Sequence, residues 1–128
     1  MDGGSVSKLH VILEINDKFK INCELKRHLS PSLVGIINRS LPVTGTIHML
    51  GNSGVYVESS IESGGERTRR EFKKGEIAFL PIGHAFCFFH KDVKIGKDLI
   101  LIGKILDDPN IILKAEPGDV VSIYCDDG

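Results

Sequence analysis

The chain has 128 residues, 41% of them hydrophobic and 26% charged, which are the proportions of an ordinary soluble globular protein. This length suits one compact domain, so we expect a single domain over residues 1–128 with a flexible segment at 1–7. The formal net charge of −1 argues against a nucleic-acid partner. No apolar run approaches the roughly twenty residues of a membrane span.

The cysteines and the start of the chain predict a cellular compartment. The opening "MDGGSVSK" lacks the basic and apolar regions of a secretory signal. Cys23, Cys87 and Cys125 are widely spaced and odd in number, which argues against a disulfide framework. These features predict a reducing cytoplasm, with one disulfide left open should the source be a hyperthermophile.

Two alternating runs open the chain. "KLHVILEI" and "KFKINCEL" each place apolar side chains at every second position, and the polar pair Asn16-Asp17 lies between them. This pattern predicts a β-hairpin with one buried face. Cys23 lies on the apolar face, which favours a buried thiol over a reactive one.

The period then changes to that of a helix. In "SPSLVGIINRSL", Ser30 suits the N-cap and Pro31 the first helical position, and the apolar residues form one stripe. Pro42 ends this helix. Further along, "DDPNIILKA" predicts a second short helix, capped by Asp107 or Asp108.

The remaining apolar runs predict strands. They are "TGTIHML", "VYVESSI", "EIAFL", "HAFCFFH", "DLILIGKI" and "DVVSIYC". The basic run "RTRREFKK" is interpreted as a solvated loop or edge strand, with a phosphate-binding patch as the alternative. About eight strands and two helices predict a sandwich or, since the helices suit its ends, a closed barrel.

The segment "HAFCFFH" also has the spacing of a metal site, His84-x-x-Cys87-x-x-His90. On a strand, however, His84 and Cys87 point to opposite faces, and His84 and His90 lie about 20 Å apart. The geometry therefore argues against a metal. The sequence also contains no nucleophile elbow, phosphate-binding loop or zinc-protease motif, so we predict no catalytic residue and no cofactor.

Read in order, these elements resemble the cyclophilin peptidyl-prolyl isomerases. "KFKINCELKRHLSPSLVGIINRSL" is similar to the family's second strand and first helix, and "LILIGKI" to its Val-Phe-Gly-Lys-Val strand. "PNIILKA" and "VVSIYCDDG" resemble its second helix and last strand. More specifically, "GEIAFLPIGHAFCFFH" resembles a group of small uncharacterised archaeal and bacterial cyclophilin-like proteins. The resemblance implies a mainly β fold: a closed eight-stranded antiparallel barrel capped by two short helices.

The catalytic set of that family is not matched. The stretch "TIHML" has no arginine where cyclophilins carry one, and His48 is its polar candidate. Val55-Tyr56-Val57-Glu58 replaces the family's Phe-Met-x-Gln, and the chain contains no tryptophan. The resemblance thus implies the barrel without the isomerase machinery.

Three hypotheses about function follow. The first is a module that binds a peptide or a small molecule, as a monomer or a small homo-oligomer and without nucleic acid or membrane. The second is a weak or divergent prolyl isomerase. The third is an assembly subunit that uses the phenylalanine-rich segment "FLPIGHAFCFFH" as an oligomer interface. For the first hypothesis, strand alternation places His48, Tyr56 and Glu58 on one outward face, unless the register shifts by one residue. Cys87 or Phe89 would lie nearby, and His84 at the rim of the ligand groove. The candidates are His48, Tyr56, Glu58, His84, Cys87 and Phe89.

Overall fold

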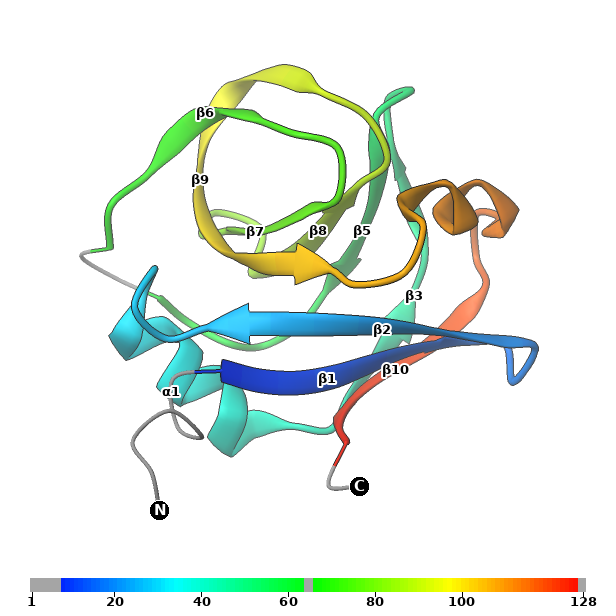
Figure 1. Cartoon of the computed structure of the whole chain (residues 1–128), viewed down its shortest axis with the longest axis horizontal. Helices are drawn as coiled ribbons and strands as arrows, with labels where there is room; N and C mark the ends of the chain where they lie inside the picture. The colour runs from blue at the N-terminus through cyan, green and yellow to red at the C-terminus, as the bar shows by residue number, and fades with distance from the viewer. Residues whose placement is uncertain (1–7, 64–65, 127–128) are drawn as a thin grey trace.

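The computed structural model describes residues 8–63 and 66–126, so the expected flexible segment 1–7 lies outside the described residues (Figure 1). The elements in chain order are β1 (Lys8–Ile15), β2 (Phe19–Lys26), α1 (Pro31–Ser40), β3 (Val43–Thr46), β4 (His48–Leu50), β5 (Gly54–Glu58), β6 (Arg69–Phe72), β7 (Glu76–Leu80), β8 (Ala85–Phe89), β9 (Val93–Ile105), η2 (Pro109–Lys114) and β10 (Val120–Cys125). Within these ranges neither helix, of ten and six residues, has the length and apolar character of a membrane span.

The strands form one antiparallel sheet in the order β3-β10-β1-β2-β9-β7-β8-β5-β4, and β6 pairs with β9. The mainly β, antiparallel class is confirmed. The expected closed barrel of eight strands is not: the described residues form ten strands, and the hydrogen-bonded path ends at β3 and β4.

Two local features account for the extra strands. The expected strand 44–50 breaks at Ile47, whose N–H donates to the Asp119 carbonyl at 2.8 Å while β4 turns away to pair with β5. The basic run, expected as a loop or edge strand, contains β6, which pairs with the first half of the long strand β9. Figure 1 shows β6 and that half of β9 curling above β7 and β8.

The first hairpin follows the sequence prediction closely. β1 and β2 pair from Lys8 opposite Lys26 to Ile15 opposite Phe19. Asn16 and Asp17 have φ values of 52° and 56°, a left-handed conformation that Asn and Asp tolerate better than other side-chain-bearing residues. Cys23 is fully buried in the main core, as its place on the apolar face predicted.

Both predicted helices are present, but Ser30 does not cap α1 with its side chain. The Ser30 hydroxyl donates instead to the Leu101 carbonyl at 3.0 Å. The Leu33 N–H in the first turn donates to the Glu66 carboxylate at 2.9 Å, so a residue 33 positions away serves a helix terminus. The second helix is a 3₁₀ helix capped by Asp108, whose carboxylate accepts from the Asn110 N–H at 3.0 Å.

Two hydrophobic clusters lie on opposite faces of the sheet. The main core contains the inward residues of β1, β2, β5, β7 and β10, together with the apolar face of α1. A smaller cluster, here called the outer cluster, lies under β6 and consists of Phe72, Ala78, Cys87, Phe89 and Leu99. β8 supplies both, because its alternate residues Phe86 and Phe88 enter the main core while Cys87 and Phe89 enter the outer cluster.

Candidate ligand-binding face

Three of the six candidate residues lie together on the outward face of β4 and β5. His48 is directly opposite Tyr56, and their rings stack with centroids 5.0 Å apart and an interplanar angle of 18°. Glu58 follows on the same face of β5, with its Oε1 atom 3.8 Å from His48 Nε2. We call these three residues the His48 platform.

The platform combines a flat surface with polar groups. The side chains of His48 and Glu58 are 42% and 62% exposed, and Tyr56 is half-buried against the outer cluster. Stacked rings offer an apolar face to a ligand, and the imidazole and carboxylate offer hydrogen-bond partners beside it. At 3.8 Å the His48–Glu58 contact is longer than a hydrogen bond, so neither group is held tightly.

The other three candidates are placed differently. Cys87 and Phe89 are fully buried in the outer cluster, so they present no surface to a ligand. His84 lies directly before β8, and its Nδ1 is 2.9 Å from the Ile61 carbonyl oxygen. Its own carbonyl accepts hydrogen bonds from the N–H and hydroxyl of Ser59. These contacts of His84 hold the segment after β5 in place at the rim of the His48 platform.

Burial also decides the chemistry of the thiols. Burial raises the pKa of Cys87 to about 12, and it raises the pKa of Cys23 further, with the charge of Asp107 adding to the effect. Thiolates are the reactive form, so both side chains are inert in the folded protein. Cys125, at the end of β10, is only half-buried.

These environments predict a labelling pattern. In native buffer at neutral pH, a thiol-alkylating reagent should modify Cys125 and leave Cys23 and Cys87 unmodified, and all three should react in denaturant. Mass spectrometry of protease digests measures this directly. Rapid native labelling of Cys87 would show that the outer cluster opens far more readily than its packing indicates.

A feature that the sequence did not reveal is the position of β4 at the end of the sheet. In the described part of the chain, β4 pairs on one side only, with β5. A hollow of about 400 Å³ lies beside this strand, between Met49 and the helix η2. Met49 and Leu113 line it and are 40% and 64% exposed. The edge of β4 therefore has the platform on one face and, on the other, a hollow that Asn52, His90 and Lys91 line together with apolar residues.

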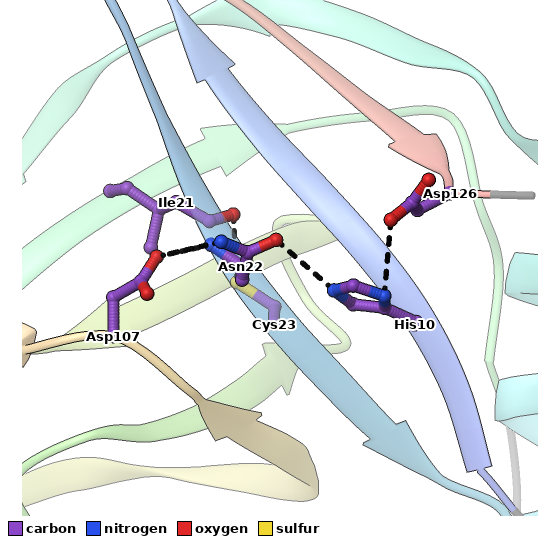
Figure 2. A network of polar contacts seen from close by, with 6 residues as sticks. All are labelled: His10, Ile21, Asn22, Cys23, Asp107 and Asp126. Carbon is purple, nitrogen blue, oxygen red and sulfur yellow. Dashed lines mark hydrogen bonds and ion pairs between the residues drawn. The ribbon is translucent and has the colours of Figure 1, made fainter. Parts of the chain in front are cut away.

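A second polar group of residues lies across β1, β2 and β10 (Figure 2). His10 Nδ1 is 3.2 Å from the Asp126 carboxylate, and His10 Nε2 is 3.2 Å from Asn22 Oδ1. The N–H and the side-chain amide of Asn22 both donate to Asp107 Oδ2, at 2.7 and 3.1 Å. Because both ring nitrogens of His10 are engaged, this chain of contacts ties strands together rather than presenting a base to a substrate.

We expect the Asp107 carboxylate to be the part of this network that contributes most to stability. Asp107→Ala removes the acceptor of two hydrogen bonds from Asn22 and should lower the free energy of unfolding by about 1–3 kcal/mol. Urea denaturation measures the change. Asp92→Ala is the matched control, because the exposed Asp92 accepts one bond from the Lys74 N–H and should cost less. Equal losses would contradict the assignment.

The phenylalanines of the segment 79–90 are buried within the chain itself, whereas Ile82 in the same segment is exposed. Phe79, Phe86, Phe88 and Phe89 are each at most 2% exposed. Among the described residues, the exposed large apolar side chains come from separate segments of the chain, and Met49 and Leu113 are the two that line one hollow. Exposed apolar side chains scattered over a surface are normal. The exposed large apolar residues are Met49, Ile82, Leu106, Leu113 and Val120.

The comparisons with known proteins agree with this fold. A family model described as cyclophilin-like matches residues 7–124. The chain belongs to the cyclophilin-like family. The resemblance seen in the sequence is thereby confirmed, while no curated protein matches the chain.

Two solved structures are similar to this cyclophilin-like chain. One is the solution structure of the hypothetical protein AF2241 from Archaeoglobus fulgidus, with 20% identity, a TM-score of 0.75, and coverage of 96% of this chain and 98% of that one. The other is McbB in complex with tryptophan, with 13% identity and a TM-score of 0.73, covering 92% of this chain but 45% of McbB. At these identities the likeness establishes the fold and not the activity.

Proposed function

We propose that this cyclophilin-like chain is a binding module that takes a short extended peptide along the edge of β4. The observation that carries the proposal is the combination at one strand: an edge with one pairing partner among the described strands, the His48 platform on its outward face, and the hollow beside Met49 on the other face.

Strand geometry supports this mode of binding. A peptide that adds to a sheet edge is held by main-chain hydrogen bonds, and its alternate side chains point to opposite faces. Beside β4, one set of side chains would lie over His48 and Tyr56, and the other set would enter the hollow lined by Met49 and Leu113. With three residues in β4, the edge spans about 10 Å, enough for three or four peptide residues.

The volume of the hollow and a protein with a similar fold are both consistent with a small peptide ligand. A hollow of about 400 Å³ is at the small end of ligand sites, which suits one side chain better than a large cofactor. McbB, whose structure was solved in complex with tryptophan, matches this chain over 45% of its own length. Glu58, on the platform, is placed to receive a peptide N–H or a cationic side chain.

NMR on isotopically labelled protein tests the proposal. We would titrate a set of short peptides, with and without an Xaa-Pro bond, and follow the backbone amides. The expected result is shifts concentrated at His48, Met49 and Leu50 and at the neighbouring residues of η2. Tyr56→Leu should weaken binding about 2- to 10-fold, because it removes the stacked ring and keeps an apolar side chain.

Tyr124→Phe is the matched control. It removes one hydroxyl, which donates to Glu14 at 2.8 Å on the β1–β10 pair, and leaves β4 untouched. Binding that is equally weakened by both variants, or shifts that avoid β4 and η2 altogether, would refute the site.

A further inference from the structure

Two adjoining hollows lie at the end of β2 and over β9, on the side of the outer cluster away from β4 and β5. Their volumes are about 480 and 490 Å³, and both are lined by His28, Leu29 and Leu101. Because they share these three lining residues, the two hollows are here together called the basic cleft. Leu101 lies four strands from His48 along a cross-strand row through Tyr56, Cys87 and Ala78, about 19 Å away at the usual strand spacing. The basic cleft is therefore separate from the His48 platform.

The cleft carries a concentration of positive charge that the chain as a whole does not have. Six cationic side chains and two carboxylates line it, whereas the formal net charge of the protein is −1. The cations are Lys26, Arg67, Arg69, Lys73, Lys74 and Lys104, and the carboxylates are Glu66 and Glu76.

The carboxylates in and beside the cleft already have other partners. Glu66 accepts from the Leu33 N–H at 2.9 Å, and Glu76 pairs with Arg69 and also accepts from the Lys73 N–H at 2.8 Å. Glu24, on β2, lies 3.8 Å from Lys26. Two of the six cations are thereby paired, Lys26 and Arg69.

Lys104 shows how the imbalance arises. It occupies the middle of a row on β9, with Glu24 opposite on β2 and Glu76 opposite on β7. Glu24 pairs with Lys26 and Glu76 pairs with Arg69, so neither carboxylate forms an ion pair with the Lys104 ammonium. In the part of the chain that the structure describes, no carboxylate lies within ion-pair distance of Arg67, Lys73, Lys74 or Lys104.

The floor of the cleft is apolar. Leu29, Leu101 and Pro109 are half-buried there, and Ile105 is buried. Another hollow, of about 880 Å³ on the β6–β9 ribbon, shares Arg69 and Lys73 with the cleft, but its Arg70, Glu71 and Lys94 side chains are paired, as Arg70–Asp98 and Glu71–Lys94. Charge without a partner beside an apolar floor distinguishes the basic cleft.

We propose that the basic cleft binds a small organic anion that carries several phosphate or carboxylate charges on an apolar or aromatic body. The unpaired ammonium and guanidinium groups would take the charged end, since hydrogen bonds to ionised oxygens are about twice as strong as neutral ones. The body would cover Leu29, Leu101 and Pro109. The combined volume admits a ligand of the size of a mononucleotide.

Isothermal titration of the full chain with ATP, benzene-1,3,5-tricarboxylate, inorganic phosphate and adenosine tests the proposal. We expect ATP or the benzenetricarboxylate to bind clearly more tightly than inorganic phosphate, because the latter lacks a body, and more tightly than adenosine, which lacks the charge. The preferred anion of the two identifies phosphate or carboxylate as the charged group. Affinity should fall on raising ionic strength from about 0.05 to 0.5 M, because salt screens exposed charges.

Variants locate the site. Lys73→Gln/Lys74→Gln and Lys104→Gln should each weaken binding of the preferred anion by about 5-fold or more, since each removes charge-assisted contacts. Lys114→Gln, at the end of η2 and outside the cleft, is the control and should leave binding unchanged. These lysines are exposed, so the variants should fold.

Three results would overturn the proposal: no heat with ATP or the benzenetricarboxylate, equal affinity for adenosine and ATP, or equal effects of the cleft and control variants. A single-stranded oligonucleotide that binds far more tightly than either small anion would instead assign the surface to nucleic acid. Loss of peptide binding at β4 leaves this site unaffected, so the two proposals fail separately.

Discussion

Replacing Gly103 by alanine should destabilise the fold more than the same exchange at any other described glycine except Gly54. A Cβ at position 103 would lie 2.0 Å from the Glu24 carbonyl oxygen and 2.9 Å from Leu25 Cα. Both atoms belong to the backbone of β2, which pairs with β9 at this point. The methyl group therefore cannot be accommodated unless the strands separate, and we expect a loss of at least about 3 kcal/mol in unfolding free energy.

Urea denaturation followed by circular dichroism measures the loss. Gly54→Ala should behave alike, because its Cβ would lie 2.0 Å from the Phe88 carbonyl oxygen between β5 and β8. Gly96→Ala is the control: its Cβ would meet no atom within 4 Å, so its stability should change by less than about 0.5 kcal/mol. A Gly103→Ala protein as stable as Gly96→Ala would show that the β2–β9 pairing is placed wrongly.

The second large effect is expected at the outer cluster. Phe89 is fully buried, and its ring stacks on Phe72 of β6 with centroids 5.1 Å apart. Phe89→Ala removes the main contact between β8 and the β6–β9 ribbon, and cavity formation of this kind costs about 3–5 kcal/mol. Hydrogen exchange should show a specific sign of this loss: amides of β6 lose protection more than those of β1 and β2.

Leu113→Ala serves as the control for Phe89→Ala, since that side chain is 64% exposed and should contribute little to stability. Uniform loss of protection over the whole sheet would contradict a separate outer cluster. So would a destabilisation no larger than that of the control.

Much of the fold follows from local patterns. The hairpin of β1 and β2 rests on alternation around Asn16-Asp17, and both features are decided within a few residues. The same rule sends Phe86 and Phe88 to one cluster and Cys87 and Phe89 to the other. Alternation does not say, however, that both faces of β8 are covered. The covering strand, β6, lies in a polar and basic run that has no pattern of burial apart from Phe72.

The candidate site likewise has a part that local patterns predict and a part that depends on long-range packing. His48, Tyr56 and Glu58 share one face because the hairpin of β4 and β5 places them there, which strand alternation predicts. Alternation also places Cys87 and Phe89 of the neighbouring strand β8 on this face, which is why the sequence predicts them in the groove. The long-range packing of β6 covers both side chains, and no local pattern indicates this. The edge of β4 and the basic cleft arise from segments far apart in the chain, so no local signal in the sequence predicts them.

The central claim, peptide binding without isomerase chemistry, is tested most directly by NMR exchange spectroscopy on the protein mixed with an Xaa-Pro peptide. Uncatalysed exchange between cis and trans forms takes tens of seconds or longer. We predict shifts at the amides of β4 without exchange cross-peaks on a sub-second timescale. Cross-peaks on that timescale that disappear in Tyr56→Leu or His48→Ala would contradict the account and make the same platform the site of a prolyl isomerase.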